Sequence, residues 1–345
     1  MRGSRRQTIV DVAQRAGVSK STAARALSNA PEISTETRKK VLEAAQALGY
    51  ERNHLAVGMR SGRSGMLGLV IPDIANPFWA EVARGAQDRA EIHGRALLIF
   101  SSDWSVERER VHLTSVRQAR VEGIILNRVA ERQQDSRLAD MPMVMIGSSA
   151  ALFPDMDNVG SNIEQGVRLA AEYLRNRGHL QPCLIVGPRQ RLAHSRFMHA
   201  VGGYYGAYGI TPDNLIVEES DYTPESGEAA MGRILDRAPK RPLAVLAVSD
   251  LIGLGAMMAT RRRGLDCPRD VSIIGFDGIQ ASSFSTPGLT AVQKPSRAIG
   301  ATSVDMLIDQ IEGRNDEARS ISLSCKLIER GSVSDLVRAA QVEVA

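Results

Sequence analysis

The sequence is poor in cysteine, and its few cysteines lie far apart. Cys183, Cys267 and Cys325 are the three cysteines among 345 residues, and none belongs to a Cys-x-x-Cys pair. The six histidines include one close pair, His194 and His199, whose spacing of five places them on different faces of a helix. The pattern therefore predicts neither a disulfide framework nor a metal site, and we expect no cofactor.

Long hydrophobic runs are also missing. The longest apolar runs have the length of a β-strand, and the opening segment MRGSRRQTIVDVAQ contains no apolar core of the kind that a secretory signal needs. We therefore expect no membrane partner and a cytoplasmic protein.

The sequence lacks the common motifs of catalytic machinery. It contains no P-loop, HExxH or GxSxG pattern, and GLGAMMA (253–259) has two of the glycines of a dinucleotide-binding turn but no acid at the expected distance. Asp250 and Asp277 each end a predicted strand, yet no motif around them suggests acid/base catalysis. We predict that the chain is not an enzyme; turnover of candidate sugars would revive that alternative.

Charge is unevenly distributed along the chain. Residues 1–64 contain twelve Lys or Arg and five Asp or Glu, a net charge of +7. Because the whole chain has a formal charge of +4, the remaining residues sum to −3. A basic head on a slightly acidic body indicates that the head meets a polyanion.

Residues 8–49 carry the pattern of three short helices. Thr8 and Asp11 form a capping-box-like start, Gly17 has the position of a helix-ending glycine, Ser19 caps a second helix, and Ser34 begins a third. The apolar stripe expected on the third helix is Val41, Leu42, Ala45 and Leu48. Two short helices joined by a tight glycine turn predict a helix-turn-helix.

The second helix, in GVSKSTAARALSN (17–29), has a basic face with no acid to balance it. At 3.6 residues per turn, one face holds Ala23, Ala26 and Leu27. The opposite face holds Lys20, Ser21, Arg25 and Ser28. Basic residues can simply keep a helical hairpin soluble, but this face together with the charge of the head favours a nucleic-acid groove.

From residue 66 onward, apolar runs of strand length alternate with helical stretches. One series of strands is MLGLVIP, RALLIFS, VEGIILN and MPMVMIG, with helices near 77–92, 106–119 and 130–139. A second series, from residue 181, is QPCLIVG, NLIVEES, PLAVLAVSD and VSIIGFD. The alternation predicts two doubly wound lobes of parallel sheet, with a cleft lined by the strand ends.

Aromatic side chains are rare, and several fall at these strand ends. Phe78, Trp79, Trp104 and Phe276 lie at or just beyond the ends of predicted strands, and Phe197 begins a helix after another. Any one of them could cap a core, but both tryptophans of the chain at adjacent strand ends favour the wall of a small-molecule cleft.

The segment from TIVDVAQRAGVSKSTAARALSN to ALGYERNHLA resembles the headpiece of the lac-repressor (LacI/GalR) family without a gap. The segments GLVIPDIANPFWAEVARGAQDRA, AVSDLIGLGAMMA and VSIIGFDGIQASSFSTPGLTAV resemble the effector-binding core of the same family, so the resemblance runs from about residue 7 to 330. It implies a helix-turn-helix headpiece (1–52), a hinge helix or linker (53–64), and a two-lobe, periplasmic-binding-protein-like domain for effector binding and dimerisation (65–345).

The resemblance also implies the residues that contact DNA. Lys20, Ser21 and Arg25 stand at base-reading positions, whereas Ser19, Thr22 and Asn29 are placed for phosphates. Thr8 and the hinge residues Asn53, His54, Ala56 and Met59 complete the expected set. Met59 replaces the usual Leu, and Gly58 weakens a hinge helix by about 1 kcal/mol relative to Ala.

In the body, the resemblance assigns a set of effector-binding residues. They are Phe78, Trp79, Asn127, Arg196 and Asp277. Ser249 stands where many members have Asn, and Lys294 near where they often have Gln; with Trp104, from its place at a strand end, they complete the expected set. Gly147 and Ser161 stand where many members have Asp, so two acids of the sugar-binding pattern are absent. The expected effector is a sugar or a sugar acid.

The sequence is thus interpreted as a transcriptional regulator, most simply a repressor. We expect a homodimer or higher oligomer that binds a near-palindromic operator and changes its affinity when a small molecule binds between the lobes. The alternative is a solute-binding protein without a DNA function, which a gel shift with operator-like DNA would distinguish.

Overall fold

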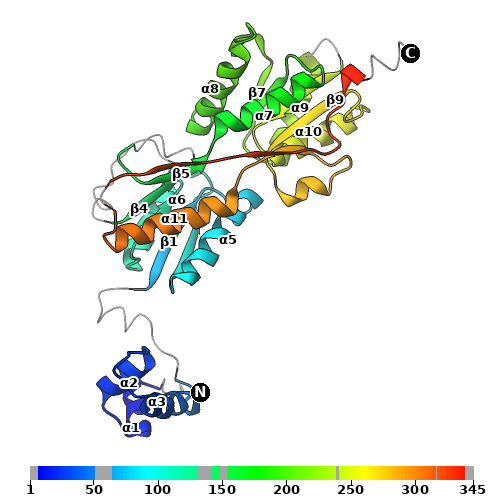
Figure 1. Cartoon of the computed structure of the whole chain (residues 1–345). Helices are drawn as coiled ribbons and strands as arrows, with labels where there is room; N and C mark the ends of the chain where they lie inside the picture. Colours follow the sequence, from blue (N-terminus) through cyan, green and yellow to red (C-terminus); the bar gives the residue numbers. More distant parts are fainter. Residues whose placement is uncertain are drawn as a thin grey trace. The chain divides into compact units, whose positions relative to one another are not determined.

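The computed structural model describes residues 7–50, 64–129, 141–147, 154–237, 241–315 and 317–338. The chain divides into two compact units, Met1–Ser64 and Gly65–Ala345, which are taken in turn (Figure 1). No helix among the described residues is long and apolar enough to cross a membrane.

The first unit is a bundle of three helices: α1 (Ile9–Ala16), α2 (Lys20–Leu27) and α3 (Thr35–Ala47). Gly17 ends α1 with a φ of 66°, in the left-handed region that glycine adopts without strain. Val12, Ala23 and Val41, one from each helix, are fully buried where the helices meet. The small side chain of Ala23 allows this close packing, so the predicted helix-turn-helix is present.

One residue of the expected apolar stripe on α3 is placed differently. Leu42 is 51% exposed, whereas Ala44 and Ala45 are buried beside Val41. The prediction for Leu42 was wrong because the buried face of α3 turns toward Ala44 and leaves Leu42 at its edge.

Lobe 1 of the second unit is a six-stranded parallel sheet with the strand order β11-β5-β4-β3-β1-β2. Helix α11 packs against α5 and faces β3, β4 and β5, whereas α6 lies against β1 and β2. The elements are β1 (Met66–Ile71), α5 (Pro77–Ile92), β2 (Ala96–Ser101), α6 (Val106–Gln118), β3 (Ile124–Leu126), β4 (Met143–Ile146), β5 (Asn158–Ser161), α11 (Ser296–Ile311) and β11 (Ser320–Leu323).

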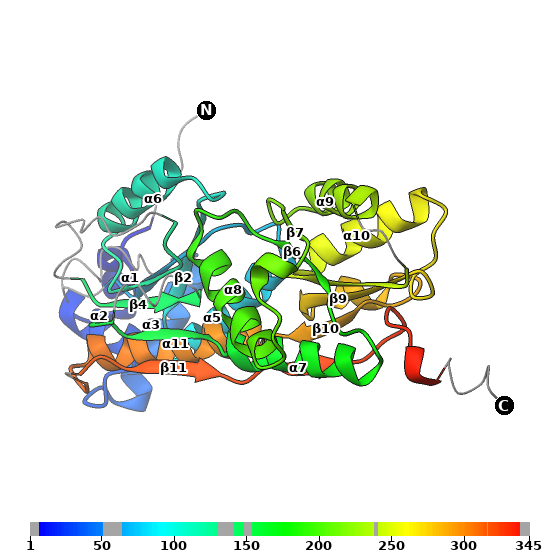
Figure 2. The same cartoon turned by 90° about the horizontal axis from the view of Figure 1, so that it is seen from above.

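Lobe 2 repeats this plan of a sheet flanked by helices (Figure 2). Its strand order is β12-β10-β9-β8-β6-β7, in which β12 alone pairs antiparallel. Its elements are α7 (Ile163–Asn176), β6 (Cys183–Val186), α8 (Leu192–Gly206), η3 (Pro212–Asn214), β7 (Val217–Glu219), α9 (Pro224–Arg237), β8 (Leu243–Ala247), α10 (Asp250–Arg262), β9 (Val271–Asp277), η4 (Gln280–Ser283), β10 (Thr290–Gln293) and β12 (Lys326–Ile328).

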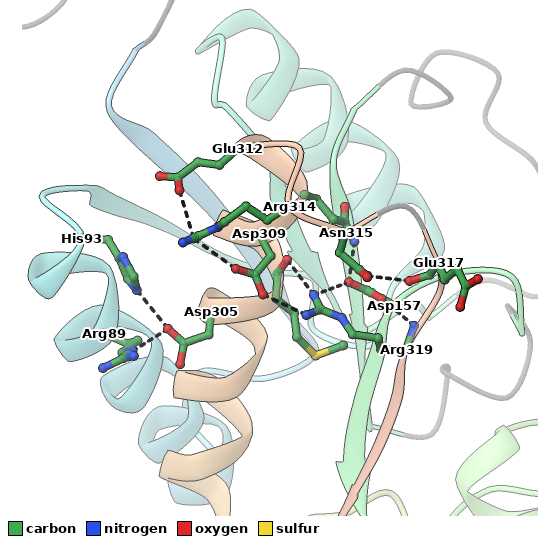
Figure 3. Close-up of polar contacts among 12 residues, drawn as sticks. Arg89, His93, Asp157, Asp305, Asp309, Glu312, Arg314, Asn315, Glu317 and Arg319 are labelled. Carbon is green, nitrogen blue, oxygen red and sulfur yellow. Dashed lines mark hydrogen bonds and ion pairs between the residues drawn. The ribbon is translucent and has the colours of Figure 1, made fainter.

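The chain passes between the lobes three times, after β5, after β10 and after β11. An ion-pair network fixes the last passage to lobe 1 (Figure 3): Arg319 donates from Nη2 to Asp157 Oδ2 at 2.9 Å and from Nη1 to Asp309 Oδ2 at 2.8 Å. Burial acts to raise the pKa of Asp157, but the hydrogen bonds from Arg319 and Gln310 outweigh it and lower that pKa. Because the carboxylate is held in its charged form, β11 is anchored beside β5.

All eight strands predicted from the two apolar series are present, as are the helices near 77–92 and 106–119. The helix expected near 130–139 lies outside the described residues. Four strands were missed: β5, β10, β11 and β12. Each of these strands has three or four residues, which is too few for a clear alternating or apolar pattern. Each also lies next to a segment that crosses between the lobes, so its pairing depends on residues distant in the sequence.

Candidate functional site

Helix α2 presents the basic face that the sequence predicted. Lys20, Ser21, Arg25 and Ser28 are exposed, and Ala23 and Ala26 are buried. The Nε of Arg25 lies 3.5 Å from the carbonyl oxygen of Ser21, one turn earlier, so the guanidinium lies along the helix surface. This unit therefore offers an exposed, positively charged helix of the size that enters a major groove.

Several of the predicted DNA-contacting residues also hold the helices in place. The Oγ of Ser19 accepts a hydrogen bond from Thr22 N at 3.1 Å and lies 2.8 Å from Thr22 Oγ1. Thr8 N donates to Asp11 Oδ2 at 2.7 Å in a capping box that begins α1. Asn29 follows α2 with a left-handed φ of 56°. The hinge residues Asn53, His54, Ala56 and Met59 lie outside the described residues.

A cavity of about 370 Å³ lies where the strand ends of the two lobes meet. Its lining includes every predicted effector-binding residue: Phe78, Trp79, Trp104, Asn127, Arg196, Ser249, Asp277 and Lys294. These residues come from both lobes, so the structure brings together side chains that are up to 216 positions apart in the sequence. The role of each in ligand binding stays a prediction.

The wall from lobe 1 is mainly aromatic. The rings of Phe78 and Trp79, in the first turn of α5, meet edge to face with centroids 5.0 Å apart. Asn76 caps that helix and accepts a hydrogen bond from Phe78 N at 3.0 Å. Asn127, directly after β3, donates from Nδ2 to the carbonyl of Ile146 at 2.8 Å. Arg128, the next residue, is the cation of this wall among the described residues and lies 3.6 Å from the carboxylate of Glu109.

The structure shows why Gly147 cannot be the Asp that many family members have at this position. Its φ is 71°, and a Cβ at this position would lie 2.5 Å from Asn127 Nδ2. An Asp side chain would therefore strain the backbone and displace the Asn127 amide. The amide of Asn127 occupies the space that a side chain at 147 would need.

The wall from lobe 2 contains a buried ion pair. Lys294 Nζ donates to Asp277 Oδ1 at 2.9 Å, and both side chains are largely shielded from solvent. Lys294 also lies over the rings of Phe78 and Phe276, at 5.1 and 5.5 Å from their centroids. Burial raises the pKa of Asp277, while the charge of Lys294 acts to lower it. The sequence did not predict this pairing.

A second buried carboxyl group lies behind Asp277. The Oδ2 of Asp250, at the start of α10, accepts hydrogen bonds from Ile279 N at 2.8 Å and from Ser282 Oγ at 2.6 Å. Its Oδ1 is buried and makes no hydrogen bond within the described part of the chain. Burial, with the nearby charge of Asp277, raises the pKa of Asp250 to about 7.

The side chain of Trp104, in the loop after β2 of lobe 1, contacts lobe 2. The sequence did not predict this contact. Its ring stacks on Tyr222 with centroids 5.1 Å apart and an interplanar angle of 12°. Arg191 lies over the same ring and donates from Nη2 to the Trp104 carbonyl at 2.9 Å. Trp104 and Tyr222 both have left-handed backbones, with φ of 57° and 63°. Such strained conformations concentrate at binding sites.

Further residues of the lining were also missed, among them Arg128, Arg189, Arg191 and Tyr222. The expectation that Phe276 forms part of the cleft wall was wrong. Phe276 is fully buried in β9 and packs edge to face on Phe197, with centroids 5.4 Å apart, inside the core of lobe 2. Successive side chains of a strand point to opposite faces of the sheet, and that of Phe276 points into the core.

The fold and the two sites define a class of protein. One unit offers a basic helix-turn-helix, and the other encloses a small-molecule cavity between two parallel α/β lobes. This combination is that of a DNA-binding regulator that responds to a small ligand.

Comparison with known proteins agrees with that class. Residues 8–53 match the bacterial regulatory proteins of the lacI family, and residues 171–333 match the periplasmic binding protein-like domain. The HTH-type transcriptional repressor PurR of Edwardsiella ictaluri (strain 93-146) is 31% identical over 334 residues, 95% of this chain and 97% of that protein.

Two solved structures are similar over nearly the whole chain. The Lac repressor dimer bound to operator and the anti-inducer ONPF is 26% identical, with a TM-score of 0.84, and the match covers 96% of this chain and 100% of that chain. The complex of the transcriptional regulator CelR with cellobiose is 28% identical, with a TM-score of 0.72, and covers 95% and 100%.

The chain belongs to the LacI family of bacterial regulatory proteins. The predicted fold class is confirmed, and so is the prediction of a DNA-binding transcriptional regulator rather than an enzyme.

Proposed function

We propose that this protein is a cytoplasmic transcriptional repressor that binds a near-palindromic operator as a homodimer, and that a small molecule between its lobes sets its affinity for DNA. The observation that carries the proposal is the pairing of an acid-free basic face on α2 with a cavity between the two lobes of the second unit. The headpiece comprises residues 1–52, the hinge 53–64 and the effector-binding and dimerisation domain 65–345.

In this proposal α2 enters the major groove. Lys20, Ser21 and Arg25 project from its exposed face toward base edges. Ser19, Thr22 and Asn29 lie at its two ends, where backbone phosphates pass, and Thr8 begins α1. The hinge residues Asn53, His54, Ala56 and Met59 complete the DNA contacts.

The effector is a sugar or a sugar acid, held by Phe78, Trp79, Trp104, Asn127, Arg196, Ser249, Asp277 and Lys294. The volume of the cavity suits one monosaccharide-sized molecule, and its aromatic walls suit the apolar faces of a sugar ring. The cellobiose complex of CelR supports a sugar-like ligand for this fold.

A homodimer is supported by the Lac repressor dimer and by large apolar side chains left on the surface of both lobes. Ile92 of lobe 1 is 72% exposed and Phe284 of lobe 2 is 74% exposed. Two headpieces related by a two-fold axis would bind two half-sites.

Arg25→Ala tests the DNA-reading role. We expect a loss of about 1–3 kcal/mol on the operator and a relaxed preference at one base pair, because a guanidinium that reads a base edge discriminates between sequences. The matched variant is Thr22→Val, which keeps the shape of the side chain and the backbone bond to Ser19 but removes a phosphate-directed hydroxyl.

Fluorescence anisotropy with operator and random DNA would separate the two roles. Thr22→Val is expected to weaken both DNAs alike, whereas Arg25→Ala weakens the operator more. If Arg25→Ala weakened random DNA as strongly as operator DNA, the base-reading assignment would be rejected.

A further inference from the structure

Most charged side chains in the lining of the cavity are basic. Among the described residues that line it, five are cationic and a single one, Asp277, is acidic. Lys294 already neutralises that carboxylate at 2.9 Å. The remaining cations are Arg128, Arg189, Arg191 and Arg196. An excess of basic over acidic side chains in the lining favours a positive potential in the cavity.

The four arginines differ in how their charge is balanced. Arg189 pairs with Glu219, with Nε to Oε1 at 2.7 Å, and 74% of its side chain is exposed. Arg128 lies 3.6 Å from the buried carboxylate of Glu109. Arg196 has Glu164 only at 3.9 Å. Arg191 makes no ion pair within the described part of the chain, and one of its five N–H groups is used on the Trp104 carbonyl.

Arg191 and Arg196 flank the start of the same helix. Four helices, α5, α7, α8 and α10, begin at the cavity, and the side chains of Asn76, Asn162 and Ser249 cap α5, α7 and α10. The N-cap of α8 is Arg191 itself, with no side-chain hydrogen bond over the first turn. The buried hydroxyl of Tyr222, another lining residue, makes no hydrogen bond to any described residue.

From this arrangement we infer that the effector is an anion: a monosaccharide-sized polyhydroxy compound whose carboxylate or phosphate binds Arg191 and Arg196 at the N-terminus of α8. The inference rests on the proposed function, because it assigns the chemistry of the same cavity. Guanidinium groups bind such anions through paired, charge-assisted hydrogen bonds. A neutral sugar would find one carboxylate for its hydroxyls, and Lys294 already occupies an oxygen of that carboxylate.

The stack of Tyr222, Trp104 and Arg191 adds a second element to the inference. It fixes the guanidinium of Arg191 by a hydrogen bond and by contact with the indole face. A pre-positioned guanidinium loses less conformational entropy when it binds an anion. Arg191 is thus a specificity-determining residue, and the aromatic pair is its support.

The test uses matched ligands on the full-length protein: glucose, gluconate and glucose 6-phosphate, the corresponding compounds of galactose and ribose, and inorganic phosphate. Both tryptophans of the chain, Trp79 and Trp104, line the cavity, so intrinsic fluorescence reports its occupancy without a label. We expect an acid or phosphate to bind at least about tenfold more tightly than its neutral sugar.

Two variants remove the same charge two residues apart. Arg191→Gln is expected to abolish the preference for the anion, whereas Arg189→Gln leaves most of it, because Glu219 already balances Arg189. The acid and phosphate arms show which anionic group is preferred.

The inference is overturned if a neutral sugar binds as tightly as its acid, if Arg191→Gln keeps the preference, or if no anion of the panel changes the fluorescence at about 10 mM. Operator binding is measured on the same preparations. An intact operator complex with any of these results rejects the anionic effector alone, whereas failure to bind operator DNA rejects the proposed function.

Discussion

The two walls of the cavity are built on different principles. The wall from lobe 1 consists mainly of aromatic and amide side chains, and Phe78 and Trp79 in it are also part of the lobe 1 core. The wall from lobe 2 contains Arg189, Arg191, Arg196 and the Asp277–Lys294 pair. The two lobes share one fold, but the wall from lobe 1 is mainly aromatic and the wall from lobe 2 is mainly charged.

Because of this difference, we expect the two walls to control different properties of the bound ligand. Side chains that are shared with a hydrophobic core resist change, because altering them alters stability. Charged side chains at the start of α8 and after β10 sit outside the core and can change with little effect on folding. We therefore expect ligand size to depend mainly on lobe 1, and ligand charge mainly on lobe 2, because the lobe 1 cation Arg128 lies beside the carboxylate of Glu109.

The largest expected effect is on stability, from Trp79→Ala. Trp79 is 7% exposed and belongs to the lobe 1 core, so its loss should lower the free energy of unfolding by about 3–5 kcal/mol. Arg191→Gln, on the opposite wall, should cost less than about 1 kcal/mol. Urea denaturation of both variants compares the walls, and equal losses would contradict the separation of shape from charge.

An intermediate effect is expected from Asp250→Asn, on the lobe 2 side. Burial raises the pKa of Asp250 to about 7, so the native state keeps a proton that the unfolded chain releases from about pH 4 upward. Stability of the wild type is therefore lost as pH rises from about 4 to 7 and is level above that. Asn keeps an oxygen for Ile279 N and Ser282 Oγ but cannot ionise.

The variant should thus be more stable than the wild type by about 1–3 kcal/mol at pH 8 and similar to it near pH 4. Thermal or urea unfolding across this range measures the difference. Parallel pH profiles for the two proteins would show that Asp250 does not titrate in this window.

The smallest effect concerns the contact that joins the walls. Trp104 and Tyr222 stack across the lobes, and a double-mutant cycle with Trp104→Ala and Tyr222→Ala should give a coupling energy of about 0.5–1.5 kcal/mol. The pair Phe197 and Phe276, inside lobe 2, is a control that joins no lobes. Coupling near zero for Trp104 and Tyr222 would mean that the stack does not hold the lobes together in solution.

The sequence predicted the features that depend on local periodicity or on the family pattern. The exposed face of α2, the eight principal strands and the place of all eight predicted effector residues in one cavity follow from such signals. Asp277 could be assigned because it ends a strand whose apolar pattern is clear and because the resemblance to the family implies its role.

Features that depend on contacts between distant segments could not be predicted. The stack of Trp104 on Tyr222 joins loops 118 positions apart, and Lys294 reaches Asp277 from the end of the next strand. The left-handed backbones at Trp104 and Tyr222 leave no signal in residues of these types. The role of Gly147 became clear from its contact with the Asn127 amide, since an absent side chain does not indicate what occupies its place.

Quenching of tryptophan fluorescence by charged solutes tests, without knowledge of the ligand, whether the cavity is positive and whether lobe 2 supplies its charge. Iodide, caesium and neutral acrylamide are compared at constant ionic strength against free N-acetyltryptophanamide. We predict that iodide quenches Trp79 and Trp104 more strongly, relative to acrylamide, than caesium does, and that Arg191→Gln reduces this excess while Arg189→Gln largely preserves it. Equal relative quenching by iodide and caesium in the wild type would show that the cavity has no excess of positive charge.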